Sequence, residues 1–165
     1  MTDITLKIDD GFFIYRVGAI IIYDDCLLMI KNEGFPYYYS VGGRVGFGET
    51  SENAIIREAR EETNLTFEID RLAYIHENLF TADFLDNKFV HDITLYYLMK
   101  PHADINNIKC SSFGMGGEKE SLHWLPIGEL TNYHMYPEFF KTELRELKDG
   151  VRHFITKDEV TVRGR

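Results

Sequence analysis

One stretch of the sequence decides the fold, and residues 42–65 of it read GGRVGFGETSENAIIREAREETNL. Its first third is rich in glycine, which allows tight turns and close approach of the backbone to a ligand. From residue 50 the apolar residues recur at helical spacing. Thr50 or Ser51 can cap the start of a helix, and Asn64 stands where a left-handed residue ends one. The stretch therefore predicts a glycine-rich loop followed by a helix over residues 50–63.

Three acidic residues dominate that helix, because Glu58, Glu61 and Glu62 stand at positions i, i+3 and i+4. At this spacing their carboxylates share one helix face and repel one another. A hard divalent cation removes the repulsion, and magnesium prefers oxygen ligands of this kind. The backbone carbonyl of Gly43 can add a further oxygen. The sequence therefore predicts a site for Mg²⁺, in which Mn²⁺ can take its place.

The remaining charges of the stretch suggest how loop and helix are joined. Glu49 precedes the helix and Arg57 lies within it, so an ion pair between them would brace the loop against the helix. Arg44 lies in the loop and is available to bind a phosphate. These two arginines complete the candidate site.

The complete pattern is Gly43, five residues, Glu49, seven residues, Arg57-Glu58-Ala59, one residue, Glu61-Glu62, one residue, Asn64-Leu65. Its five charged positions would coincide by chance about once in a million registers. The pattern resembles the Nudix box of the Nudix hydrolases. One position departs from it, because Asn64 stands where the family usually has glycine, and asparagine tolerates the left-handed conformation.

The resemblance implies a magnesium-dependent hydrolase that cleaves a phosphoanhydride bond in a nucleoside diphosphate linked to another moiety. Carried over to this chain, it makes Glu58 and Glu62 the main metal ligands, with Glu61 and the Gly43 carbonyl as further ligands. Arg57 would act beside the catalytic Glu58 and Glu61, and Glu49 would have a structural role. Water activated by the metal would be the nucleophile.

The general base stays open, because it varies within the family. A box glutamate such as Glu58 is one candidate, and a glutamate on a later loop, Glu120 or Glu118, is another. His91 is a candidate contact for a substrate phosphate or base, and Glu77 and Asp92 lie on the same pair of expected strands. Several aromatic residues near the loops could each stack on a nucleobase, and the sequence favours none of them over the others: Tyr37, Tyr38, Tyr39, Phe80 and Phe113.

The rest of the chain predicts strands with one further helix. Strands are expected over residues 17–23, 26–30, 37–41, 72–80, 89–99 and 120–125, followed by a helical turn over 126–130. A second helix is expected over 137–147, and short strands are expected within 151–162. Residues 101–117 read as a polar connection. The order predicts an α/β/α sandwich with a mixed sheet and helices on both faces, formed by one domain over residues 1–165.

Composition limits the partners of the protein. The formal net charge of −9 repels nucleic acid, so a small-molecule nucleotide is expected rather than a stable nucleic-acid partner. No apolar run approaches the ~20 residues that span a bilayer, and no signal segment opens the chain, so we expect no membrane partner and a cytoplasmic location. Cys26 and Cys110 indicate neither a disulfide nor a zinc site, and Cys26 is expected in the core. A homodimer is compatible with the sequence.

Two other functions compete with the hydrolase. An isoprenoid diphosphate isomerase shares the fold, but it needs a paired Cys and Glu, and neither Cys26 nor Cys110 stands in a matching context. A catalytically inactive nucleotide-binding or regulatory module is the second alternative. Such modules usually lose box carboxylates, whereas this chain keeps them. The sequence does not identify the substrate.

Overall fold

The computed structural model describes residues 1–108 and 117–157. Two positions discussed above, Cys110 and Phe113, lie outside the described residues, as does the end of the expected tail from residue 158 onward. Among the described residues no helix has the length and apolar character needed to cross a membrane.

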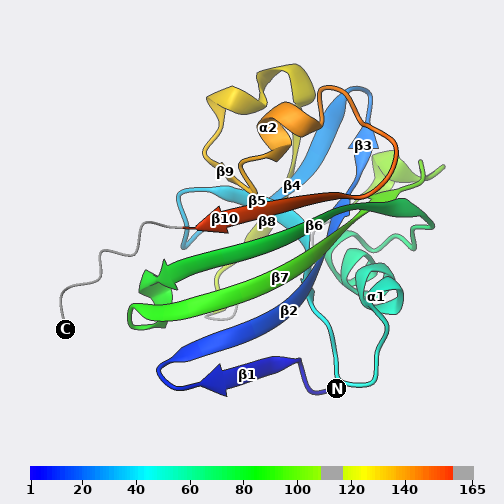
Figure 1. Ribbon diagram of the computed structural model, residues 1–165. Helices are drawn as coiled ribbons and strands as arrows, with labels where there is room; N and C mark the ends of the chain where they lie inside the picture. The colour runs from blue at the N-terminus through cyan, green and yellow to red at the C-terminus, as the bar shows by residue number, and fades with distance from the viewer. Residues whose placement is uncertain (109–116, 158–165) are drawn as a thin grey trace.

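In the part of the chain that the structure describes, ten strands form one mixed sheet, in which the order β10-β6-β7-β2-β5-β4-β3 is extended by β1 on β2, β8 on β4 and β9 on β5. Three pairs are parallel (β10 with β6, β2 with β7 and β5 with β9), and the others are antiparallel. Figure 1 shows the long strands β2, β7 and β6 side by side, with α1 and α2 away from each other. The elements are β1 (Thr5–Ile8), β2 (Gly11–Ile20), β3 (Ile22–Tyr23), β4 (Cys26–Asn32), β5 (Tyr38–Arg44), α1 (Ser51–Thr63), β6 (Ile69–Ala82), β7 (Lys88–Met99), β8 (Glu120–Pro126), β9 (Met135–Tyr136), α2 (Phe140–Glu143) and β10 (Arg152–Lys157), with 3₁₀ turns at Asp83–Leu85, Ile105–Asn107 and Ile127–Asn132.

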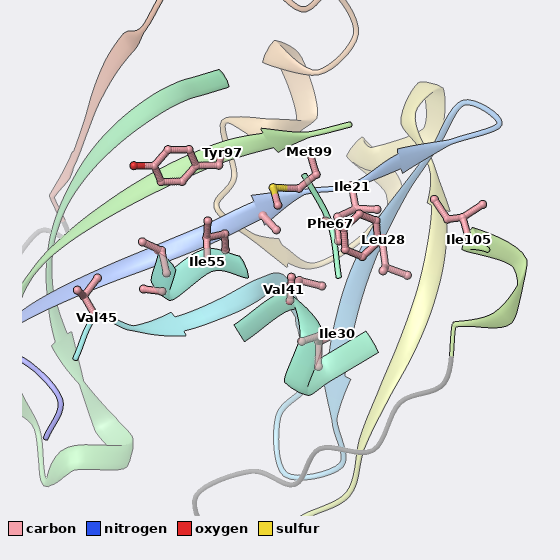
Figure 2. Packing of buried hydrophobic residues seen from close by; sticks show 14 residues of the cluster. Ile21, Leu28, Ile30, Val41, Val45, Ile55, Phe67, Tyr97, Met99 and Ile105 are labelled. Atoms are coloured by element: carbon pink, nitrogen blue, oxygen red, sulfur yellow. The ribbon is translucent and has the colours of Figure 1, made fainter. Parts of the chain in front are cut away.

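Helix α1 covers one face of the sheet. Successive side chains of a strand point to opposite faces, and in β2 Val17 and Ala19 point toward α1. They pack with Ile55 and other buried residues in a cluster that includes Val41 of β5 (Figure 2). The core thus begins directly beneath the helix that carries the box glutamates.

The opposite face is covered by α2 and by the 3₁₀ turn Ile127–Asn132. Ile20 of β2 and Met29 of β4 point to this side, where they form a second cluster with Leu130 and with Phe140 and Leu144. Apolar clusters on both faces, each closed by a helical segment, confirm the α/β/α sandwich and the mixed sheet.

The N-terminal part of the sheet and the second helix differ from the predictions. The strand expected over 17–23 divides into β2 and β3, and β2 begins at Gly11, where it pairs with the unexpected β1. The helix expected over 137–147 shortens to α2, because Phe140 and Leu144 are buried while Leu147 is exposed. The buried residues of this segment therefore anchor one helical turn. Cys26, expected in the core, is only half-buried.

Candidate active site

The position of α1 is fixed at both ends by local signals. The Thr50 side chain accepts a hydrogen bond from the backbone N–H of Asn53, as expected of an N-cap. Asn64 ends the helix with φ of 61° and donates its backbone N–H to the Arg60 carbonyl. Both caps agree with the sequence. The two caps fix where the helix begins and ends, and the side chains of its last two turns face the glycine loop.

Glu49 and Arg57 form the expected brace between loop and helix. Arg57 donates from Nε to Glu49 Oε1 and from Nη2 to Glu49 Oε2, both at 2.9 Å, while the Gly46 N–H donates to Oε2 at 3.0 Å. The Arg57 hydrogen bonds hold the pKa of the Glu49 carboxyl below its usual value. Arg57 Nη2 also donates to the Arg44 carbonyl at 3.1 Å. One guanidinium therefore ties the loop, the end of β5 and α1 together.

Glu58 lies directly against Gly43. A Cβ at Gly43 would stand 2.4 Å from the Glu58 carboxyl carbon and 2.5 Å from both carboxylate oxygens, so only glycine leaves room for this placement. Arg57 Nη1 donates to Glu58 Oε1 at 2.7 Å. Burial nonetheless raises the pKa of the Glu58 carboxyl, and the hydrogen bond from Arg57 opposes that shift only in part.

Glu62 is the most buried of the box glutamates, with 8% of its surface exposed. Its Oε2 accepts a hydrogen bond from the Gly42 N–H at 2.9 Å. Burial raises the pKa of this carboxyl well above its usual value, and the neighbouring Glu58 and Glu120 add to the rise. Gly42 has φ of 146° and a Cβ there would meet the Val17 carbonyl at 2.2 Å, so this backbone also requires glycine.

Glu61 differs from its two neighbours, because its side chain is 59% exposed and lies 3.6 Å from Arg57 Nη1. Within residues 1–108 and 117–157, no three acidic, histidine or cysteine side chains already enclose a metal position. The donor set nevertheless fits a hard cation. Two carboxylates, Glu58 and Glu62, are held against the Gly42-Gly43 backbone in surroundings that disfavour their ionised forms, and a divalent cation removes that cost.

Glu120 joins this site from the first position of β8. Tyr39 of β5 donates its hydroxyl hydrogen to Glu120 Oε1 at 2.6 Å. Glu120 also lies close enough to Glu62 to raise the pKa of that carboxyl. The other glutamate considered as a base, Glu118, is exposed and lies beside Gly34. The geometry therefore brings Glu120 to the box glutamates.

Arg44 faces a second arginine that the sequence did not bring to notice. Arg16 of β2 is the register partner of Arg44 in the antiparallel β2–β5 pair. The Arg16 guanidinium opposes the rise that burial causes in the pKa values of Glu58, Glu62 and Asp92, so it lies within electrostatic range of all three. Like charges directly opposite on paired strands destabilise a sheet. An anion between Arg16 and Arg44 would relieve this repulsion.

His91 lies farther from the box. It pairs with Phe13 of β2, whereas Gly43 is level with Val17, four residues farther along that strand. At ~3.3 Å per residue this separation is about 13 Å along the sheet. The His91 ring packs edge-on to Phe13, and its Nε2 lies 3.8 Å from Glu77.

Asp92 points to the opposite face from His91. It accepts a hydrogen bond from the Thr94 hydroxyl at 2.7 Å and lies 4.0 Å from Arg16 Nε. Strands β6 and β7 pair as expected, but the three polar groups do not converge: Glu77 and His91 share one face, and Asp92 lies on the other.

The described aromatic candidates have different surroundings. Tyr37 stacks on Phe35, with centroids 5.3 Å apart and planes inclined by 22°. Tyr38 packs edge-on against His123 and Tyr133 on the other face of β5. Phe80 packs against a small apolar cluster away from the box, and Tyr39 is hydrogen-bonded to Glu120. Only Tyr39 is thus tied directly to a candidate catalytic group.

Comparison with known families shows the family of the protein. The model of the NUDIX domain matches residues 13–147. The chain belongs to the Nudix family. Nudix enzymes are pyrophosphohydrolases that act on small nucleotide substrates and generally use divalent metals, so the chain is a Nudix pyrophosphohydrolase. No match was found among curated proteins.

Solved structures support the Nudix fold. A mutator MutT protein from Bacillus halodurans is 18% identical over 87% of this chain and 90% of its own, with a TM-score of 0.65. A Nudix-family hydrolase from Clostridium perfringens is 22% identical over 80% of this chain and 97% of its own, with a TM-score of 0.56. An ADP-ribose pyrophosphatase from Streptococcus suis is 14% identical over 86% and 98%, with a TM-score of 0.52. At these identities the likeness concerns the fold alone.

Proposed function

We propose that this Nudix enzyme hydrolyses a phosphoanhydride bond in a nucleoside diphosphate linked to another moiety, with Mg²⁺ as its cofactor and Mn²⁺ able to replace it. The observation that carries the proposal is the placement of Glu58 and Glu62. Glu62 is buried and Glu58 is partly buried against the Gly42-Gly43 backbone, and burial raises both of their pKa values. Two such groups beside each other fit a divalent cation better than any neutral ligand.

The residues have separate roles in this proposal. Glu58 and Glu62 hold the cation, with the Gly43 carbonyl and the exposed Glu61 as further ligands. When bound, the cation neutralises phosphate charge and lowers the pKa of a water molecule that attacks phosphorus. Arg57 keeps Glu58 in place through the 2.7 Å hydrogen bond and is itself anchored by Glu49.

In this proposal Arg16 and Arg44 bind the phosphates of the substrate. Arg16 and Arg44 stand opposite each other on β2 and β5, where Asp92 lies 4.0 Å from Arg16 and Asp3 lies 3.8 Å from Arg44. In this proposal a substrate diphosphate binds to the two guanidinium groups. His91, about 13 Å along the sheet, would contact only the far part of an extended substrate. Removing the arginines should therefore weaken binding more than removing His91 does.

Glu120 is the residue that we propose as general base. It is held by the Tyr39 hydroxyl and lies within electrostatic range of Glu62, so it borders the space between the box and β8. A general base must reach the proton that it removes, directly or through one water. Glu58, the other candidate, already accepts a hydrogen bond from Arg57 and is assigned here to the cation.

The proposal also covers the partners, the domain organisation and the location of the protein. The charge of −9 argues against a stable nucleic-acid partner and favours a small nucleotide whose phosphates are screened by the cation. We also propose that the chain functions as one domain, that its location is cytoplasmic and that a homodimer is compatible with function.

The proposal is tested by a hydrolysis screen with and without Mg²⁺ over nucleoside triphosphates, ADP-ribose, nucleotide sugars and diadenosine polyphosphates. We expect Glu62→Gln to abolish magnesium-dependent turnover, because glutamine still accepts from the Gly42 N–H but carries no charge. Thermal unfolding of the variant controls for folding. Turnover retained in Glu62→Gln would contradict the metal assignment, and no turnover of the wild-type protein on any substrate would contradict the enzymatic function.

A further inference from the structure

A chain of polar side chains crosses three neighbouring strands beside the site. Asn32 ends β4, Tyr39 lies on β5, and Glu120 begins β8. In the register of the sheet Asn32 pairs with Glu120, and Tyr39 pairs with Ile30, two residues before Asn32. Ile30 and Tyr39 belong to the core under α1, so these alternating positions place all three polar side chains on the face that α1 covers.

Asn32 is the unusual member, because this amide is only 2% exposed. A buried amide side chain costs stability unless its hydrogen-bonding groups are satisfied. Its Oδ1 accepts from the Gly34 N–H at 2.7 Å, and its side chain lies close enough to the Tyr39 hydroxyl to oppose the rise in the pKa of that group. Asn32 is thus held by the turn that follows β4.

The direction of each hydrogen bond follows from the donors available. Tyr39 has one hydroxyl hydrogen, and it is donated to Glu120 Oε1 at 2.6 Å. Toward Asn32 the tyrosine oxygen can therefore only accept, so the Asn32 amide nitrogen is the group that can donate to it. The chain runs from the Gly34 N–H through Asn32 and Tyr39 to the Glu120 carboxylate. Hydrogen bonds aligned in this way polarise one another, and an O–H to carboxylate bond of this length is a strong one.

We propose that Tyr39 and Asn32 are positioning residues that hold the Glu120 carboxylate at the edge of the box site in the orientation that proton removal requires. The proposal rests on the proposed function, in which Glu120 is the general base. A glutamate at the first position of a strand has several rotamers, and the hydroxyl of Tyr39 selects among them. Neither residue touches the reacting atoms, so both act through Glu120.

The test compares four variants of the full chain on whichever substrate the wild-type protein hydrolyses. Tyr39→Phe removes the donor and keeps the ring, and Glu120→Gln removes the base. The double variant Tyr39→Phe/Glu120→Gln tests whether the two act as a unit. Tyr38→Phe is the matched control, because Tyr38 is adjacent in sequence but packs on the opposite face against His123 and Tyr133.

We expect Glu120→Gln to lower kcat by about 10²-fold or more, as removal of a general base does. Tyr39→Phe should lower kcat about 10-fold while KM changes less than about two-fold, because a misplaced base affects chemistry rather than binding. In the double variant the tyrosine substitution should cost nothing further, since its partner is already lost. Tyr38→Phe should leave kcat unchanged.

A second substitution, at Asn32, tests the same inference while the Tyr39 hydroxyl is kept. Asn32→Asp keeps the shape and the acceptor for the Gly34 N–H, but it can only accept from Tyr39 and competes with Glu120 for the hydroxyl hydrogen. We expect kcat to fall and KM to stay, with a melting temperature that shows a folded protein.

The outcomes separate this inference from the function on which it rests. A wild-type protein without turnover contradicts the function itself. If the wild-type protein is active, wild-type kcat in Tyr39→Phe overturns the inference, and so do wild-type kcat in Glu120→Gln and a further loss of kcat when Tyr39→Phe is added to Glu120→Gln. A rise in KM without a change in kcat in Tyr39→Phe would assign the tyrosine to substrate binding and overturn it as well.

Discussion

Substituting Gly43 by alanine places a methyl group where the Glu58 carboxylate now lies. The new Cβ would stand 2.4 Å from the carboxyl carbon, whereas ordinary van der Waals contact begins near 3.4 Å. The obstacle is the end of a flexible side chain, so we expect Glu58 to move rather than β5. The required shift is about 1 Å, the difference between the two distances.

A shift of this size has different consequences for activity and for stability. Misplacement of a catalytic group by ~1 Å lowers activity by about 10²-fold. The fold should lose little, because Glu58 keeps its place on α1 and only its carboxylate moves away from the Gly43 backbone. We therefore expect Gly43→Ala to lower kcat/KM about 100-fold and to change the free energy of unfolding by less than ~1 kcal/mol.

The neighbouring Gly42 provides the control. There the methyl group would meet backbone, the Val17 carbonyl at 2.2 Å and the Gly18 Cα at 2.8 Å, and φ of 146° is unfavourable for alanine. We expect Gly42→Ala to destabilise the fold by about 2 kcal/mol or more. Steady-state kinetics and denaturant unfolding of both variants measure the contrast. Gly43→Ala with near wild-type kcat/KM would refute the reasoning, because Glu58 would then not depend on the glycine.

Three further outcomes are expected. Glu49→Ala should lower the free energy of unfolding by about 2 kcal/mol in denaturant titrations, less than the ~3–5 kcal/mol of a fully buried pair because Arg57 is 31% exposed. For Glu62 the raised pKa means that the folded state binds the proton more tightly than the unfolded state. In buffer without divalent cations, stability should therefore fall as the pH rises from about 4.5 through the folded pKa. Melting curves of Glu62→Gln should show a smaller fall, because Glu58 keeps its own raised pKa. His91→Ala should raise KM for an extended substrate and leave kcat and its pH profile unchanged, and a changed pH profile would return His91 to the chemistry.

The box helix was predictable because its signals are local. Thr50 and Asn64 act on backbone groups within four residues of themselves, and the expected boundaries of α1 agree with the structure to within one residue. The Glu49–Arg57 brace was also predictable, because one helix and its preceding loop bring the two residues together. Residues 42–65 therefore contain the information that determines the helix, its caps and the ion pair.

The contacts that the sequence did not reveal, together with Arg16, depend on pairings between distant segments. Arg16 meets Arg44 only because β2 pairs with β5, and Glu120 meets Tyr39 across 81 residues because β4 lies between β5 and β8. No local periodicity encodes such a pairing. The same reason explains why β1 was missed, since its exposed residues have meaning only beside β2.

One part of the proposed site is thus determined by a continuous segment of the chain, and the other part is determined by strand pairing. The helix and its glycine loop supply the carboxylates that a cation requires, with a geometry that one continuous segment fixes. The strands supply what surrounds the substrate: the arginines of β2 and β5 and the tyrosine-held Glu120 of β8. Substitutions in the strands can therefore alter binding or proton transfer while Glu58 and Glu62 keep their backbone contacts at Gly42 and Gly43. In the proposed site, substrate preference can therefore change through strand residues while the proposed metal ligands keep their positions.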